Sequence, residues 1–178
     1  MANCAYILLG SNIDKEHNLP EAVRLLASFD HVVAVSSVYE TAPVGLEDQP
    51  HFFNAAVQVQ TDLTAAAFRR QVLAKIEHIL GRVRTEDKNA PRTIDADMIL
   101  FNDEVFELDE THHIPDPELR QFPHVAVPIA ELAPDLIHPE SGERLAYMAA
   151  QLAVRPSDSG PPSLCRRTDI RLDSLLEN

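Results

Sequence analysis

The stretch that decides the fold is residues 91 to 100, Pro-Arg-Thr-Ile-Asp-Ala-Asp-Met-Ile-Leu. Its apolar residues predict a strand over Thr93–Phe101, and because side chains alternate along a strand, Asp95 and Asp97 share one face. Two carboxylates close together on a half-buried strand repel each other and lose hydration, so they need a cation. Oxygen ligands favour Mg²⁺, which is usually shared between carboxylates and the phosphates of a substrate. For the pair alone, an edge strand with a solvated acidic face is the alternative.

A cluster of cations leads into this strand. Arg82, Arg84, Lys88 and Arg92 place four of the chain's 15 Lys and Arg residues in one short segment, although the formal net charge is -13. Carboxylates for a metal and cations for phosphate oxygens are the minimal equipment of phosphoryl transfer, which depends on positioning and on neutralising charge. No GxxxxGK[ST] motif occurs, and the chain has 5 glycines, so the basic segment must hold the phosphates. A solvated loop with scattered charges is the alternative for the cluster alone.

The composition bounds the class of protein. The chain has 178 residues, of which 45% are hydrophobic, which is enough for one buried core. Its acidic balance argues against a nucleic-acid partner. Cys4 and Cys165 form no CxxC pair, and no stretch approaches the roughly 18 apolar residues of a membrane span. We expect a cytoplasmic protein, without membrane association, that is a monomer or a weak homo-oligomer.

Hydrophobic periodicity places three further strands and two helices before the Asp95 stretch. The strands are expected at Ala5–Leu9, Val32–Tyr39 and Phe52–Gln60. The first helix is expected to open at Pro20, and the second to be capped by Thr61, Asp62 or Thr64 and to end before Gly81, with Phe68, Val72, Ile76 and Ile79 on its apolar face. The resulting order, β-α-β-β-α-β, predicts an α+β ferredoxin-like core with an antiparallel sheet.

The pattern after Phe101 is less regular. Four prolines interrupt it before a short helical stretch near Ala130, which predicts C-terminal helical additions. Residues 155–163 are rich in Pro and Ser, which is typical of a linker. The segment Ile170–Leu176 predicts one or two amphipathic turns that dock on the domain or on a second subunit. We therefore expect a catalytic domain over residues 1–154 and a linker with a short tail over residues 155–178.

Three motifs in this order and spacing resemble the 6-hydroxymethyl-7,8-dihydropterin pyrophosphokinase family, over residues 5 to about 150. They are Leu9-Gly10-Ser11-Asn12, Ser36–Thr41 with Asp48-Gln49-Pro50 through Val57, and Gly81–Arg84 through Asp97. The resemblance implies an ATP-dependent diphosphotransferase of folate biosynthesis, which transfers diphosphate from ATP to the hydroxymethyl group of a reduced pterin and releases AMP. A pterin-binding or nucleotide-binding paralogue with weakened catalysis is the alternative.

The resemblance also implies roles for individual residues. Asp95 and Asp97 are expected to bind two Mg²⁺ ions and, with Arg82 and Arg92, to serve catalysis. The nucleotide site is expected to comprise Glu77, Arg82, Arg84, Lys88, Arg92 and Met98. The pterin site is expected to comprise Thr41, Val44, Phe52, Asn54 and His124.

Three positions depart from the family pattern. Asp116 replaces a histidine on the nucleotide side, and Asn89 replaces a tryptophan of the flap. His124 replaces the second stacking phenylalanine, although a locally shifted alignment would give that role to Phe122. Since an imidazole has a pKa near 6.5, we expect pterin affinity to weaken between about pH 8 and pH 6.

Overall fold

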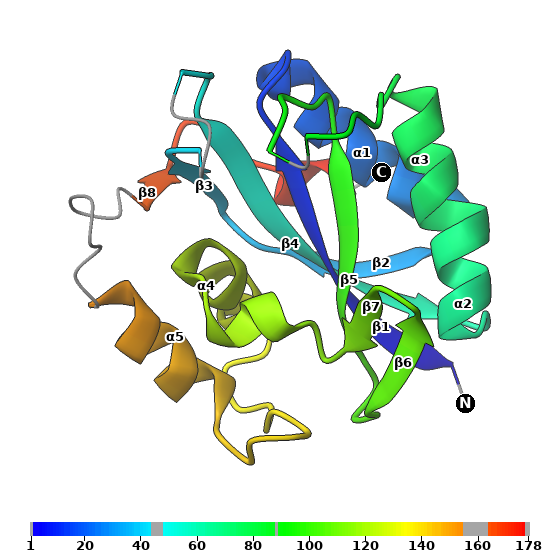
Figure 1. The fold of residues 1–178 in the computed structure, drawn as a ribbon, viewed down its shortest axis with the longest axis vertical. Coiled ribbons are helices and arrows are strands. Elements are labelled where there is room, and N and C mark those ends of the chain that lie inside the picture. Colours follow the sequence, from blue (N-terminus) through cyan, green and yellow to red (C-terminus); the bar gives the residue numbers. More distant parts are fainter. Residues whose placement is uncertain (1, 44–47, 88, 155–163, 177–178) are drawn as a thin grey trace.

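A six-stranded antiparallel sheet runs through the computed structural model, which describes residues 2–43, 48–87, 89–154 and 164–176 (Figure 1). Its strands are β1 (Asn3–Ser11), β2 (His31–Val35), β3 (Val38–Thr41), β4 (Phe52–Thr61), β5 (Asp95–Phe101) and β8 (Cys165–Arg167). Neighbouring strands follow the order β5-β1-β4-β3-β8, and β2 also pairs with β4. Because β2 and β3 together take the place of one strand, the predicted α+β ferredoxin-like class is confirmed.

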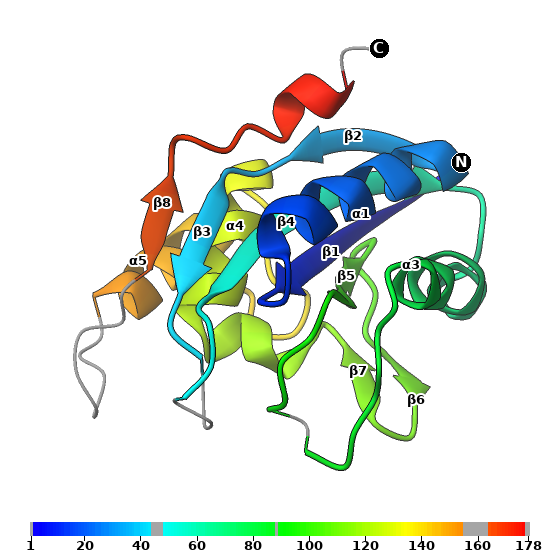
Figure 2. The same cartoon turned by 90° about the horizontal axis from the view of Figure 1, so that it is seen from above.

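Helices cover both faces of the sheet (Figure 2). One face carries α1 (Lys15–Phe29) and a long helix made of α2 (Ala65–Phe68), the π-helical turn η1 (Arg69–Leu73) and α3 (Ala74–Ile79). The other face carries α4 (Pro123–Leu132) and α5 (Leu145–Ala153). Strand β1 is buried on both sides as a result: Ile7 and Leu9 belong to the first core, and Tyr6 and Leu8 to the second.

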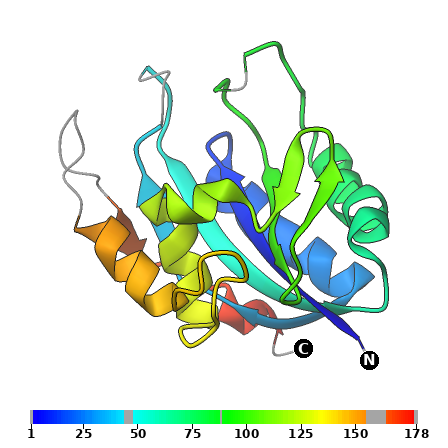
Figure 3. The same cartoon turned by 60° about the horizontal axis from the view of Figure 1, so that its bottom comes forward.

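The chain segments that surround one end of the sheet rise on the same side (Figure 3). They are the connection from β3 to β4, the connection from α3 to β5, and a small hairpin of β6 (Phe106–Asp109) and β7 (His112–Ile114). The 3-10 turn η2 (Pro117–Arg120) then leads into α4. The sequence did not predict the hairpin, because strands this short leave little periodicity.

Helix α1 begins at Lys15, so the predicted start at Pro20 is wrong. Two hydrogen bonds from Asn18 tie the first turn to the residues before the helix. Its side-chain Nδ2 donates to the Ile13 carbonyl at 2.7 Å, and its backbone N–H donates to the Asp14 carbonyl at 2.8 Å. Pro20 lies inside the helix and has no backbone N–H to donate, and the helix tolerates this missing hydrogen bond because its first turn is anchored.

The predicted strand Val32–Tyr39 is two strands with a change of register between them. Val35 pairs with Val57 and Tyr39 pairs with Asn54, so β2 and β3 contain one more residue than the facing part of β4. Buried Ser36 fills the bulge, because its hydroxyl accepts from the Ala56 amide at 2.8 Å and its amide donates to the Ala56 carbonyl at 2.9 Å. The bulge turns β3 toward the edge of the sheet.

The second helix starts as expected, with Thr64 as its N-cap, and Gly81 follows it with a φ of 71°. The expectation that Ile79 lies on the apolar face is wrong, since Ile79 is 49% exposed. The π turn inserts one residue, which rotates everything after it by about 100° around the helix axis. Glu77 becomes buried instead, at 6% exposure.

The described tail residues dock on their own domain. Strand β8 pairs with β3, and the turn η3 (Asp173–Leu176) follows Leu172, which is 2% exposed and belongs to the first core. Among the described helices, none combines the length and apolar character that a bilayer crossing requires.

Ser36→Ala should destabilise the fold by about 1–3 kcal/mol, because it leaves the buried Ala56 amide without its acceptor. Chemical denaturation measures the loss. Ser28→Ala, on the exposed side of α1, is the control and should change stability by less than about 0.5 kcal/mol. Equal losses in the two variants would show that the bulge does not depend on the hydroxyl.

Candidate active site

One row of residues crosses the sheet and forms the floor of the site. Tyr39, Asn54, Gly10 and Asp95 are successive partners on β3, β4, β1 and β5. Directly opposite residues project to the same face, so Asn54 and Asp95 both face the α4 side, with Gly10 between them. A Cβ atom at Gly10 would lie 3.3 Å from Asn54 Oδ1, so glycine leaves the room that the amide occupies.

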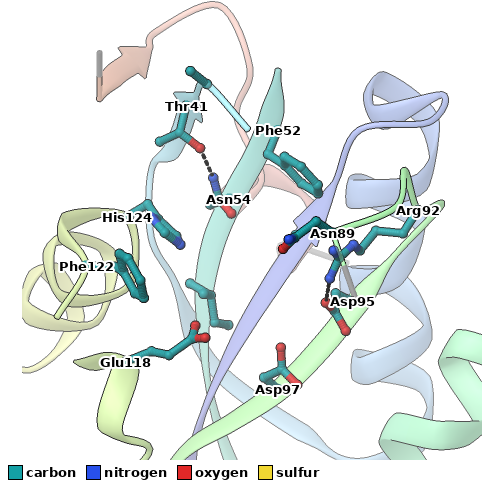
Figure 4. Close-up of a pocket in the computed structure, with 13 residues that line it drawn as sticks. Thr41, Phe52, Asn54, Asn89, Arg92, Asp95, Asp97, Glu118, Phe122 and His124 are labelled. Carbon is teal, nitrogen blue, oxygen red and sulfur yellow. Dashed lines mark hydrogen bonds and ion pairs between the residues drawn. The ribbon is translucent and has the colours of Figure 1, made fainter. Parts of the chain in front are cut away.

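A cavity of about 410 Å³ opens over this floor (Figure 4). Phe52 and Arg92 stand on one side, and Phe122 and His124 stand on the other, with ring centroids 5.3 Å apart and planes 30° apart. Asn54 Nδ2 donates to Thr41 Oγ1 at 2.9 Å. The residues that line the cavity are Leu8, Gly10, Thr41, Ala42, Phe52, Asn54, Asn89, Arg92, Asp95, Asp97, Glu118, Phe122 and His124.

A second cavity, of about 350 Å³, lies between the α2–α3 helix and the β6–β7 hairpin. Its lining includes Glu77, Arg84, Asp97 and His112. Arg69 on the π turn forms an ion pair with Asp109 and thus ties the helix to the hairpin. Asp97 lines both cavities, so the two spaces adjoin at this residue.

Negative charge is concentrated at this meeting point. Burial raises the pKa of Asp97 well above its ordinary value, and the charge of Asp95 raises it further. Arg92 forms an ion pair with Asp95. Two carboxylates of this kind suit a hard cation such as Mg²⁺. The described residues contain no cluster of three or more His, Cys, Asp or Glu ligands, so a bound ion would complete its shell with water and phosphate oxygens.

Arg82 supplies positive charge beside the same carboxylates. Its side chain is 11% exposed, and Nη2 lies 3.9 Å from Asp95 Oδ1. Burial lowers the pKa of Arg82, and the charge of Asp95 opposes that effect. Nε and Nη1 are buried and have no hydrogen-bond acceptor within the described ranges. A buried guanidinium with unused donors is a site for an anion with several oxygens.

Glu77 reaches the second cavity because of the π turn. Its Oε2 accepts from Arg84 Nη2 at 2.6 Å, and its Oε1 accepts from the Ala96 amide at 3.2 Å. Burial raises the pKa of Glu77, and the charge of Arg84 opposes the shift. Glu77 therefore holds Arg84 at the rim of the second cavity and contacts the strand that carries the two aspartates.

Asn12, the residue directly after β1, joins the two connections that border the larger cavity. Asn12 Nδ2 donates to Gln49 Oε1 at 2.9 Å and to the Pro50 carbonyl at 3.1 Å. Asn12 Oδ1 accepts from the Arg92 amide at 2.8 Å. One buried amide thus fixes the β3–β4 connection relative to the arginine.

Most of the residues that the sequence singled out converge here, in the positions already described. Val44 and Lys88 lie outside the described residues. Met98 is 5% exposed in the first core and lines neither cavity. Asp116 also lines neither cavity; its carboxylate accepts from the Glu118 amide at 2.8 Å and caps η2.

Several lining residues were not predicted from the sequence. Glu118, for example, points into the larger cavity (Figure 4). Phe122, by contrast, was the alternative that the shifted alignment offered for the second ring, and it lies beside His124 in the same cavity. Arg69, Asp109 and His112 border the second cavity. In the sequence, these three residues are polar side chains on a helix or in the irregular region after Phe101. Such a position alone does not indicate a site.

His124 behaves differently from the sequence-based expectation. Burial lowers its pKa to about 4, so the imidazole is neutral between pH 8 and pH 6. The premise of the expected pH dependence, an imidazole pKa near 6.5, is therefore wrong. A neutral ring beside Phe122 forms a wall for a flat uncharged ligand.

The family model of 7,8-dihydro-6-hydroxymethylpterin-pyrophosphokinase (HPPK) matches residues 6–134. The chain belongs to this family.

Curated relatives agree with the match. The 2-amino-4-hydroxy-6-hydroxymethyldihydropteridine pyrophosphokinase of Bacillus subtilis is 44% identical over 135 residues, which are 74% of this chain and 79% of that protein. The folic acid synthesis protein fol1 of Schizosaccharomyces pombe is 36% identical over 144 residues, which are 79% of this chain and 19% of that protein.

A solved structure supports the fold. The crystal structure of wild-type Plasmodium falciparum HPPK-DHPS with pteroate superposes with a TM-score of 0.67 at 14% identity, and the match covers 87% of this chain and 43% of that chain.

Acid should destabilise the protein through His124. The pKa of His124 is about 4 when folded and near 6.5 when unfolded, so between these values the unfolded chain binds the extra proton. Stability therefore falls as pH drops from about 6.5 to 4. His124→Phe should lose less unfolding free energy between pH 7 and pH 5 than the wild type, measured by chemical denaturation. The control is His17→Phe, on the exposed side of α1, which should show the same dependence of unfolding free energy on pH as the wild type. If His124→Phe also shows the wild-type dependence, the imidazole is not buried.

Proposed function

We propose that this chain transfers the diphosphate of ATP to the hydroxymethyl group of 6-hydroxymethyl-7,8-dihydropterin and releases AMP. The observation that carries the proposal is that Asp97 lines both cavities. Two substrates bound in adjoining spaces can react directly at their junction, without a covalent enzyme intermediate. The proposal includes a cytoplasmic enzyme that is a monomer or a weak homo-oligomer.

The larger cavity suits the pterin. Phe52 offers an aromatic face on one side, and His124 and Phe122 offer faces on the other. The Asn54 amide, oriented by Thr41, offers a donor and an acceptor to the polar rim of a heteroaromatic ring. We propose Thr41, Phe52, Asn54 and His124 as pterin-binding residues, with Val44 expected from the family resemblance.

The second cavity suits the nucleotide. Glu77 and Arg84 line it, and Arg82 and Arg92 lie beside Asp95, which lines the larger cavity. We propose that these three arginines bind phosphate oxygens, with Lys88 and Met98 expected from the family resemblance. The unused donors of Arg82 are the strongest support for an anionic ligand at this point.

Asp95 and Asp97 would hold two Mg²⁺ ions, which when bound neutralise the phosphate chain of ATP. In the reaction, the hydroxymethyl oxygen bonds to the β-phosphorus while the bond from that phosphorus to the α–β bridging oxygen breaks. AMP leaves with the bridging oxygen, and the hydroxyl proton passes to water or to a nearby carboxylate. The chain's own contribution is to hold the substrates in line and to place Arg82 and Arg92 against the developing charge.

The alternative, a paralogue with weakened catalysis, relied on Asp116 and Asn89. The Asp116 carboxylate caps η2, so it does not face either cavity. Asn89 lines the larger cavity and accepts from Gln49 Nε2 at 2.9 Å through its carbonyl, a contact that does not depend on its side chain. A coupled assay of AMP release from ATP and the reduced pterin tests the proposal against the alternative.

Asp97→Asn should abolish AMP release and leave the fold intact. Since the folded pKa of Asp97 is raised, its ionisation costs stability as pH rises above the unfolded value near 3.9. The variant should therefore melt at a higher temperature than the wild type at pH 8, and the difference should be smaller at pH 4. Asp103→Asn, an exposed carboxylate after β5, is the control for both measurements. AMP release by Asp97→Asn at a near wild-type rate would show that the Asp97 carboxylate is not needed for the reaction.

Arg92→Ala should lower kcat by about 10²-fold or more, because a guanidinium placed against the transferred phosphoryl group acts mainly in the transition state. Steady-state kinetics with both substrates measure the change. Arg24→Ala, whose side chain is 53% exposed on α1, should be indistinguishable from the wild type. A rise in the KM for ATP with kcat unchanged would make Arg92 a ground-state binding residue.

A further inference from the structure

The row that forms the floor of the site continues into the C-terminal tail. Arg166 on β8 is the partner of Tyr39, so the row runs through Arg166, Tyr39, Asn54, Gly10 and Asp95. The family match ends at residue 134, and β8 lies beyond it. A segment outside the matched region thus abuts the strand that carries Thr41.

Arg166 ties β3 to α4 on the cavity side of the sheet. Its Nε donates to Ser37 Oγ at 2.9 Å, and its Nη2 lies 3.9 Å from Glu131 Oε1. Glu131 on α4 also accepts from the Tyr39 hydroxyl at 2.9 Å and from the Ser37 hydroxyl at 2.8 Å. Glu131 lies on the same helix as His124, so this cluster fixes the helix that forms one wall of the larger cavity.

Arg167 ties β3 to β4 and α1 on the opposite side of the sheet. Its Nη1 donates to Glu40 Oε2 at 2.7 Å, and its guanidinium lies 4.9 Å from the centroid of the Phe53 ring. Lys15 on α1 approaches the same two groups, at 2.9 Å from Glu40 Oε1 and 4.2 Å from the Phe53 centroid. The residues on either side of Glu40 and Phe53 include Thr41, Phe52 and Asn54, which border the cavity.

We propose that Arg166 and Arg167 are positioning residues, which set the distance between the Thr41–Asn54 rim and the His124 wall of the larger cavity. Arg166 holds the wall through Glu131, and Arg167 holds the rim through Glu40. The two arginines act on the pterin side and leave the second cavity unchanged. The expected change in the KM for the pterin rests on the proposed function. The expected change in amide exchange rests on the fold alone.

The experiment compares full-length variants. Arg166→Ala should raise the KM for the pterin by about 5-fold, and Arg166→Ala with Arg167→Ala by about 30-fold, because each removed hydrogen bond is worth roughly 1 kcal/mol, which is about 5-fold. The KM for ATP should stay within about 2-fold of the wild-type value, as expected for a surface-charge change away from that site. Arg167→Lys keeps a cation beside Glu40 and should restore most of the affinity. Arg171→Ala is the control, since Arg171 is 76% exposed on the same tail and pairs with Asp173.

Amide hydrogen exchange, followed by NMR, tests the structural part without turnover. The amides of Thr41 and of Ala126, which donates to the Phe122 carbonyl at 3.1 Å in the first turn of α4, should exchange about 5-fold faster in the double variant, as a loss of roughly 1 kcal/mol in local stability requires. The amide of Glu77 should not change. Unchanged exchange at Thr41 and Ala126 would overturn the inference, and so would an equal rise in both KM values. Absence of AMP release in the wild type would reject the proposed function, while the exchange data would still decide the role of the arginines.

Discussion

The pairing of β1 with both β4 and β5 is the constraint on which the site depends. This pairing brings Gly10, Asn54 and Asp95 into one row, although they come from three distant parts of the sequence. Because side chains alternate along a strand, a slip of one residue in either pairing would turn Asn54 or Asp95 into the opposite core. The two buried cores oppose such a slip, since it would place a polar side chain in an apolar core and exchange the apolar side chains that each core packs. The same burial that stabilises the fold therefore orients the polar groups.

The site itself is electrostatically unfavourable without its ligands. Half-buried Asp97 lies close to Asp95, and half-buried Arg82 has two buried donors, Nε and Nη1, that find no acceptor among the described side chains and backbone. Each of these groups loses hydration without full compensation. Such arrangements persist where a ligand supplies the missing partner, and the surrounding core tolerates the cost. Under the proposed function, carboxylates and guanidinium groups so placed would suit a cation and phosphate oxygens before either binds.

Features that depend on local pattern could be predicted from the sequence. The common face of Asp95 and Asp97 follows from strand alternation, and the capping role of Thr64 follows from its residue type. Features that depend on a single inserted residue could not: the bulge at Ser36 and the π turn before Glu77 both change the phase of an otherwise regular pattern. The pKa of His124 was equally inaccessible, because it reflects burial by chain segments distant in the sequence.

The position of β1 also determines how the chain can assemble. Asn3 pairs with Thr61 and Ala5 pairs with Phe101, so the first strand made is completed by the last strand of the ferredoxin-like core. Contacts of such wide sequence separation require large loops to close, which slows folding relative to helical proteins of similar size. Until Phe101 has left the ribosome, β5 cannot pair with β1. One edge of β1 is then unpaired, and both cores are incomplete. Exposed strand edges and apolar faces of this kind associate with other chains, so the interval before β5 emerges is when this protein is most vulnerable to aggregation.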